Sequence, residues 1–391
     1  MKLAESQKEN SIAKMVSLYF IILPIYSIIK LEIGLKSHFI VPVLYLILMI
    51  INRKRIDFRY TGVILIFFII QIPYSIWGYR EYLYNWFGLM YLLFFCSLPW
   101  FTIGFSIKDL STVFLEVNKK LLIILGTNIL LIIYCYIRGR SMLGNMEISY
   151  SILPLAIFSF YYFFENKSIK FLFYAIFSSL MIVIIGSRGA LLCIVMFFIL
   201  YAITNFKKNL VVTTLIIVLG ISFLFNYDKI INQAIYILDY YNIGSRTLAK
   251  FANGDITNDT GRSRLHEVAI ENLDKKPLIG LGLGVERIVI NKEVNNMEKD
   301  MSSSYSHNLI IEILAQYGYI IGGIVILCLG YLIIRAFIKG KKIERDFIIV
   351  LFSMEIIRLF LSSSYLLSPL FFLLLGGCFN IIDKEKVKGE K

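Results

Sequence analysis

The sequence predicts an all-α polytopic integral membrane protein with about twelve transmembrane helices and one large extracytoplasmic loop containing short helices. Of its 391 residues, 58% are hydrophobic and only 17% are charged, and the mean hydropathy is +0.73. A soluble protein needs a more polar surface than this composition can supply, so the composition excludes that class. Apolar runs also alternate with short charged links, until the chain turns polar between residues 227 and 307.

The predicted membrane segments are twelve apolar runs, of which the first, second and eleventh are short. Tilted segments, re-entrant segments and segments merged with a neighbour are the alternatives for individual runs. In chain order the runs are 16–29, 39–51, 60–78, 84–105, 121–137, 150–164, 171–185, 190–205, 210–225, 309–334, 347–361 and 365–382. The predicted organisation is therefore membrane helices 1–9 in residues 1–226, an extracytoplasmic loop at 227–307, membrane helices 10–12 in 308–382 and a cytoplasmic tail at 383–391.

Lysine and arginine concentrate in alternate links, such as 53–59 and 335–345, and in the C-terminal tail. Positive links remain on the cytoplasmic side of a membrane. We therefore expect a multi-pass membrane protein with both termini cytoplasmic, the long loop outside and no cleavable signal peptide. The net charge of +13 is then a topology signal, and no nucleic-acid partner is expected.

The five cysteines all lie in apolar runs without paired spacing, which is typical of packing residues. The three histidines, His38, His266 and His307, form no cluster of ligand spacing with cysteines or carboxylates. We therefore predict neither a metal site nor a cofactor.

His307 is the first candidate for a catalytic residue. It follows the residues SSSYS and opens the apolar run at 309–334, so it lies at the outer N-terminus of a membrane helix, with Ser304 or Ser306 as possible caps. The positive helix end favours the neutral imidazole that a general base needs. The alternative is an interfacial histidine that bonds to a serine or to water.

Three arginines are candidates for binding an anion. Arg188 lies in GSRG between two apolar runs, where a guanidinium either meets an anion or caps a helical hairpin by snorkelling. Arg262 and Arg264 begin a helix predicted at 262–274. Their guanidinium forks suit phosphate, although surface ion pairs with Glu267 and Glu271 explain them equally well.

Weaker substrate-binding candidates lie around these residues. Gly282 and Gly284 of PLIGLGLG could let the backbone approach a phosphate, although a plain turn is the better default. The basic link with Arg138 and Arg140 could attract an anionic headgroup, and snorkelling is its alternative.

Three charges fall inside predicted membrane helices. Glu312 has no local partner, so it either orients a catalytic group or contacts Arg358 across helices. Glu355 and Arg358, spaced i to i+3, are expected to neutralise each other.

Three pieces of the chain together resemble one family. They are GSRGALL at 186–192, an arginine-led helix that runs into PLIGLGLG, and SHNLIIEILAQYGYIIGG at 306–323. In this order and relation to the membrane, residues 171–323 resemble the O-antigen ligase and the O-antigen and capsular polysaccharide polymerase superfamily of bacterial membrane glycosyltransferases.

The resemblance implies roles for three residues. Arg188 and Arg264 would hold the pyrophosphate of an undecaprenyl-diphosphate-linked glycan, and His307 would activate the acceptor sugar. The family helix usually carries an aromatic residue four positions after its arginine, where this chain has Val268. Spacing to PLIG favours Arg264 over Arg262, which remains the alternative.

The function predicted from this resemblance is polymerisation of undecaprenyl-diphosphate-linked repeat units into O-antigen, capsular or exopolysaccharide by metal-independent inverting glycosyl transfer. The resemblance places this reaction on the outer face of the bacterial cytoplasmic (inner) membrane. The partners would be the lipid bilayer, the undecaprenyl-diphosphate-linked glycans and a polysaccharide chain-length regulator. The alternatives are a ligase that passes finished glycan to another acceptor, a transporter of lipid-linked oligosaccharide and a structural membrane scaffold.

Overall fold

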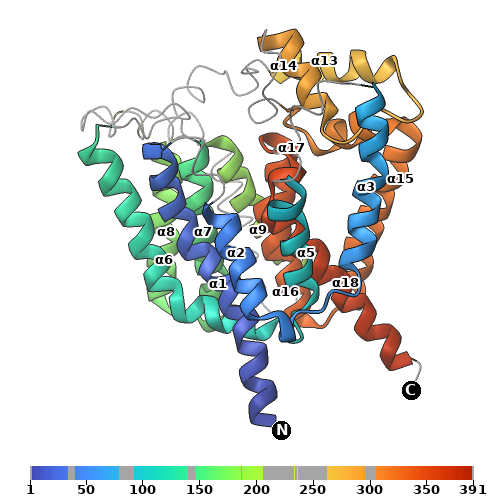
Figure 1. Ribbon diagram of the computed structural model, residues 1–391. Coiled ribbons are helices and arrows are strands. Elements are labelled where there is room, and N and C mark those ends of the chain that lie inside the picture. The colour runs from blue at the N-terminus through green and yellow to red at the C-terminus, as the bar shows by residue number, and fades with distance from the viewer. Residues whose placement is uncertain are drawn as a thin grey trace. The chain divides into compact units, whose positions relative to one another are not determined.

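The computed structural model describes residues 2–33, 40–78, 92–139, 146–185, 187–205, 233, 236, 262–295 and 305–389. Within these residues the regular elements are all helical (Figure 1), which confirms the all-α class. They are α1 (Lys2–Ile33), α2 (Ile40–Ile51), α3 (Thr61–Gly78), α5 (Leu98–Phe105), α6 (Ser111–Ile137), α7 (Met146–Asn166), α8 (Ile169–Ile185), α9 (Arg188–Asn205), α13 (Arg262–Asp274), α14 (Val285–Asn295), α15 (Leu309–Lys339), α16 (Lys342–Leu351), α17 (Ile357–Leu361) and α18 (Pro369–Gly389), with short 3₁₀ and π turns between some of them.

Five of the described helices are long and apolar enough to cross a membrane. They are Ser11–Glu32 within α1, α6, α7, α9 and α15. Shorter apolar helices are Val41–Ile51, Thr61–Trp77 and Ile169–Ile185. The chain is therefore a multi-pass membrane protein.

The prediction of about twelve membrane helices goes beyond what the described helices show. The predicted run at 210–225 and the first part of the run at 84–105 lie outside the described residues. The run at 347–361 is divided among α16, a π-helical turn at Phe352–Ile356 and α17. The helix predicted at 262–274 is confirmed as α13.

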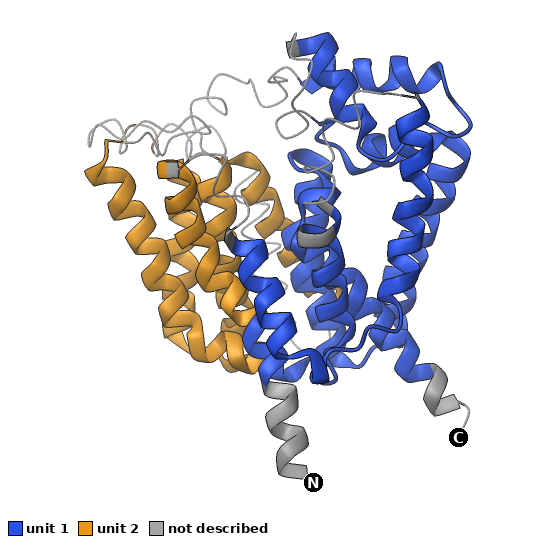
Figure 2. Cartoon of the chain, viewed as in Figure 1, with its two compact units in different colours: residues 1–15, 39–112, 259–391 blue, residues 16–38, 113–258 orange. Residues whose placement is uncertain are grey.

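The chain forms two compact units (Figure 2). Unit 1 comprises residues 1–15, 39–112 and 259–391, and unit 2 comprises residues 16–38 and 113–258. Unit 1 therefore contains α13 to α18 and His307, whereas unit 2 contains α7, α8 and α9.

Aromatic side chains join the helices of unit 2. The Phe164 ring of α7 stacks 4.9 Å from the Tyr201 ring of α9, and Phe160 meets Phe198 edge to face at 4.7 Å. The Tyr201 hydroxyl donates a hydrogen bond of 2.9 Å to Glu165. Buried aromatic area thus stabilises this bundle while the polar ends find partners.

Glycines bring α5 and α18 of unit 1 into close contact. A Cβ at Gly376 would lie 2.1 Å from the Phe101 carbonyl oxygen, and one at Gly104 would lie 2.3 Å from that of Leu373. Small residues let helices approach in this way within a membrane. The backbones of α5 and α18 are therefore in direct contact at these two glycines.

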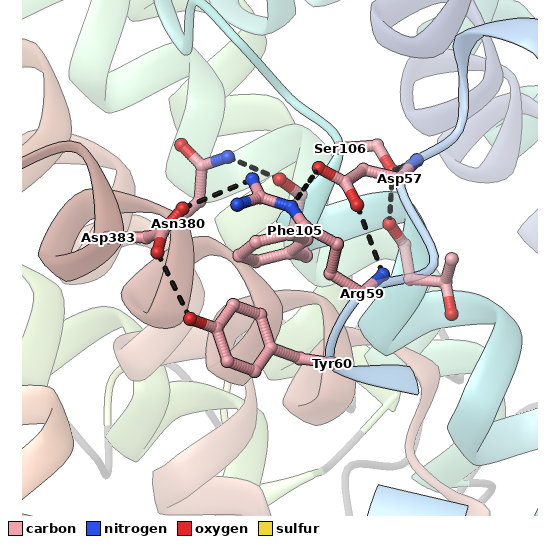
Figure 3. A network of polar contacts seen from close by, with 8 residues as sticks. Asp57, Arg59, Tyr60, Phe105, Ser106, Asn380 and Asp383 are labelled. Carbon is pink, nitrogen blue, oxygen red and sulfur yellow. Dashed lines mark hydrogen bonds and ion pairs between the residues drawn. The ribbon is translucent and has the colours of Figure 1, made fainter. Parts of the chain in front are cut away.

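A polar network fixes one end of the same helices (Figure 3). Arg59 pairs with Asp57 (2.9 Å) and with Asp383 of α18 (3.1 Å), and the Tyr60 hydroxyl donates to the other Asp383 oxygen (3.1 Å). The backbone N–H of Asp57 donates to Ser106, just after α5 (2.8 Å). The link between α2 and α3 is thereby attached to α5 and α18.

Candidate functional site

His307 lies two residues before α15 in a left-handed backbone conformation, with φ of 54°. Such a conformation costs about 1–2 kcal/mol for a residue other than glycine, so its surroundings must hold it. The helix is capped by Asn308, whose side chain accepts hydrogen bonds of 3.0 and 3.2 Å from the N–H groups of its second and third residues. The prediction that Ser304 or Ser306 caps this helix is therefore wrong.

The imidazole of His307 is electrically neutral at physiological pH. Burial lowers its pKa to about 4, and the positive charges of Arg262 and Arg287 act in the same direction. A hydrogen bond with the backbone of Ser362 opposes this shift. The buried Nδ1 has no hydrogen-bond partner among the described residues. The ring is thus in the state that a general base needs, with burial as the main cause.

A fully buried charge cluster surrounds Arg287 of α14. Arg287 and Glu312 of α15 are both 0% exposed, and their charged atoms lie 3.5 Å apart. The guanidinium also donates to the Ser364 hydroxyl, which donates to Glu312 at 2.5 Å. The second Glu312 oxygen accepts from the Tyr365 N–H at 3.2 Å. Buried charges require this degree of pairing, so α14, α15 and the segment after α17 meet here.

Two carboxyl groups face this one guanidinium, because Glu286 lies 3.9 Å from Arg287. Burial, followed by the charge of Glu312, raises the pKa of Glu286 to about 8. Glu286 therefore holds a proton at neutral pH, and the cluster carries no net charge. The Gln316 amide donates to Glu286 at 3.0 Å and accepts from the Tyr365 hydroxyl at 2.5 Å.

Glu286 and Arg287 are site residues that the sequence analysis missed. The signal that could have found them is the charged pair inside the apolar run VERIVI at 285–290. Glu312 contacts Arg287, a partner that neither alternative for Glu312 named. The predicted pair of Glu355 and Arg358 is confirmed, with a separation of 3.3 Å.

The two arginines at the start of α13 lie in different surroundings. The Arg262 guanidinium donates to the Leu361 carbonyl, next to the Ser362 backbone that His307 contacts. Arg264 is exposed and lies 3.4 Å from Glu267 and 3.8 Å from Glu271. The structure therefore brings Arg262 to His307 and gives Arg264 the ion partners that its alternative reading names.

The PLIGLGLG segment lies against a break in α15. At Gly318 the backbone has φ of 80° and ψ of 171°, so α15 consists of two helical pieces. Backbone hydrogen bonds join the break to the segment: Leu281 N–H to Ala315 O (2.8 Å), Gly282 N–H to Gln316 O (3.0 Å) and Tyr319 N–H to Pro277 O (2.7 Å). The loop thus supplies partners for backbone groups that a continuous helix would bond internally.

Gly282 and Gly284 both have positive φ, of 106° and 69°. A Cβ at Gly282 would lie 2.4 Å from the hydroxyl oxygen of Ser75 on α3. Close packing against α3 and α15 is thus a structural reason for glycine at position 282. Phosphate binding by these glycines stays a prediction.

The remaining predicted residues belong to unit 2 or lie outside the described residues. Arg188 is the first residue of α9, where Ser187 accepts a hydrogen bond from the Ala190 N–H at 3.4 Å. Arg138 follows α6 and lies 3.4 Å from Glu32 of α1. Arg140 is outside the described residues. The structure therefore groups His307 with Arg262 and Arg287 within unit 1.

This arrangement can accept a proton from a hydroxyl group through the neutral His307, and the guanidinium of Arg262 beside it can bind an anion. Among the residues described, no group of three or more His, Cys, Asp or Glu side chains could hold a metal ion. Fold and site together define a multi-pass membrane protein with a candidate acid–base centre at the start of α15.

The particular family follows from comparison with known proteins. Residues 173–328 match the family model described as "O-Antigen ligase", and the chain carries a domain of this family over those residues. The resemblance noted in the sequence is thereby confirmed. The family comprises membrane enzymes of the O-antigen ligase and polymerase type, which act on lipid-linked glycans by glycosyl transfer. Searches of the curated proteins and of the solved structures found no match.

Proposed function

We propose that this protein polymerises undecaprenyl-diphosphate-linked repeat units into O-antigen, capsular or exopolysaccharide at the outer face of the cytoplasmic membrane. The observation that carries the proposal is the neutral, partly buried His307 beside Arg262, within a domain of a family that acts on lipid-linked glycans. The growing glycan would leave its diphosphate carrier and join a hydroxyl of the next lipid-linked unit.

The chemistry divides into two tasks. A lipid diphosphate is already a good leaving group, so catalysis must deprotonate the acceptor hydroxyl and stabilise charge on the departing pyrophosphate. His307 performs the first task, and general-base help of this kind is worth about 10² to 10⁴ in rate. Arginines perform the second, because a guanidinium binds phosphate oxygens through two N–H groups.

Arg188 and Arg264 are the proposed pyrophosphate ligands. Arg262 is a strong alternative to Arg264, because its guanidinium donates to the carbonyl of Leu361, next to the backbone that His307 contacts. Arg264 instead forms ion pairs with Glu267 and Glu271. The activated hydroxyl attacks the anomeric carbon from the face opposite the departing diphosphate. The configuration at this carbon is therefore inverted. The proposed topology places both termini in the cytoplasm and residues 227–307 outside.

A ligase is the second candidate, and the description of the matching family model favours it. It would use the same donor and the same base but would pass finished glycan to a different acceptor. The distinction lies in the products, since a polymerase creates longer lipid-linked chains and a ligase consumes them.

The test is the profile of envelope glycan and of lipid-linked intermediates in the native host. It compares a deletion strain with strains rescued by wild type, His307→Ala and the control His38→Ala, whose position lies between the first two predicted apolar runs. The proposal expects single repeat units after deletion, no ladder with His307→Ala, and a full ladder with wild type and with the control.

Other profiles would overturn parts of this proposal. Long glycan accumulating on undecaprenyl diphosphate in the deletion strain identifies a ligase. A normal ladder with His307→Ala removes this residue from the role of base, provided that the variant protein is present in the membrane at the wild-type level.

A further inference from the structure

We propose that Arg287 is a positioning residue for His307 and that it acts through the ring of Tyr305. The inference rests on the proposed function, because it assumes that His307 is the base. The Arg287 guanidinium carbon lies 5.1 Å from the centre of the Tyr305 ring. The Tyr305 and His307 rings lie 4.1 Å apart, inclined at 44°. The three side chains thus form a column from the buried cluster to the imidazole.

Arg287, at one end of this column, is held firmly in place. Arg287 is fully buried, and its guanidinium is held by Ser364, Glu312 and Glu286. Replacing a buried ion pair by apolar residues is often neutral or stabilising, so stability alone is a weak explanation for such a cluster. A planar cation on the face of an aromatic ring is attracted to it, and the attraction is larger when the pair is desolvated. Arg287 therefore fixes the Tyr305 ring.

His307, at the other end of the column, needs neighbouring groups to hold its ring in position. His307 has a left-handed backbone, and its Nδ1 has no hydrogen-bond partner among the described residues. The contact with the Ser362 backbone is one restraint on the ring. The Tyr305 ring is a second restraint, since aromatic rings at this separation attract each other. Together they fix the direction in which the imidazole faces the acceptor.

The column also carries an electrostatic effect. The charge of Arg287 disfavours an imidazolium at His307, as does the charge of Arg262 on α13. Arg287 is also connected to His307 through the Tyr305 ring. Removing its charge should therefore shift the protonation of the base, whereas removing the ring should disturb its orientation.

The first test uses Tyr305→Leu, with Tyr305→Phe as the matched control that keeps the ring. Both leave the charged cluster intact. Purified protein in liposomes is assayed for glycan transfer from an undecaprenyl-diphosphate-linked repeat unit. We expect Tyr305→Leu to lower kcat about 10- to 100-fold, a fraction of the general-base contribution, with KM unchanged. Tyr305→Phe keeps the ring, so its kcat should fall less than that of Tyr305→Leu.

The second test separates charge from geometry. The double variant Arg287→Gln with Glu312→Gln removes both charges, so no unpaired carboxylate from Glu312 remains in the cluster. The acid limb of its pH–rate profile should move upward from about 4. It should remain below the ordinary histidine value of about 6.5, because burial, the main cause of the lowered pKa, is unchanged. Arg287→Lys keeps the charge, so its acid limb should stay in place while its kcat falls, because an ammonium lacks the planar stack.

The outcomes separate this inference from the proposed function. An inactive His307→Ala together with a wild-type rate and pH profile for Tyr305→Leu would overturn the positioning role alone. Equal losses in Tyr305→Phe and Tyr305→Leu would assign the effect to the hydroxyl and would also overturn it. An active His307→Ala would instead overturn the proposed function. All variants are assayed at one temperature that lies below the thermal unfolding transition of each of them.

Discussion

Replacement of Gly318 by alanine should destabilise unit 1, because this residue breaks α15 in a conformation almost exclusive to glycine. With φ of 80° and ψ of 171°, another residue would incur about 1–3 kcal/mol of strain. A Cβ would also lie 2.4 Å from the Leu278 carbonyl oxygen and 2.7 Å from the Ile279 nitrogen. Overpacking of this kind costs about 1–3 kcal/mol. The expected loss is therefore about 2–6 kcal/mol.

Gly323→Ala is the matched control in the same helix. A Cβ at Gly323 would have nothing within 4 Å, and the residue has helical geometry. Alanine in a helix interior is favoured over glycine by about 0.5–1 kcal/mol. The two variants add the same methyl group, so a difference between them reports the break in α15.

The assay is an intrinsic-fluorescence melt of each purified protein at one scan rate, since unfolding of large proteins is commonly irreversible. Gly318→Ala should lower the apparent Tm by about 5 °C or more, whereas Gly323→Ala should leave it unchanged or raise it. Gly318→Ala should also reduce transfer, because the break holds the piece of α15 that carries Glu312. An unchanged Tm for Gly318→Ala would refute the reasoning.

Three further predictions concern charge. Burial lowers the pKa of His307 to about 4, and a general base must be unprotonated. The transfer rate should therefore fall only as the pH approaches about 4. A rate that is already half-maximal near pH 6.5 would contradict this. The pKa of Glu286 is raised to about 8 from its ordinary value of 4.5, so the folded state keeps a proton that the unfolded chain releases. Stability should therefore decline as pH rises from 4.5 to 8. Glu286→Gln should flatten this decline, and an unchanged slope in melting experiments would contradict it. Arg264→Ala should change the free energy of unfolding by less than about 0.5 kcal/mol, because Arg264 and its partners are exposed. A full glycan ladder from this variant would assign the pyrophosphate contact to Arg262 in place of Arg264.

Features with a local cause were predictable from the sequence. Apolar runs gave the helical class, and the 3.6-residue period with the Lys-Lys-Pro ending gave α13 at 262–274. The pairing of Glu355 with Arg358 is also local, because residues three apart share a helix face. The motif pieces, taken in order, gave the family that residues 173–328 match.

The partners of buried charges could not be predicted in the same way. Arg287 meets Glu312 and Ser364, which are remote in sequence, and only the folding of unit 1 brings them together. The left-handed backbone of His307 likewise depends on its surroundings. Hydropathy identified Glu312 as a costly charge, but its partner had to come from the structure.

The central claim is that the protein transfers glycan between lipid-linked units with His307 as the base. The most direct measurement supplies purified protein in liposomes with a single undecaprenyl-diphosphate-linked repeat unit. It follows both glycan length and release of undecaprenyl diphosphate, for wild type and for His307→Ala. The account predicts longer lipid-linked chains with one undecaprenyl diphosphate released for each bond formed, and neither product from the variant. Absence of release by the wild type, or equal release by His307→Ala, would contradict it.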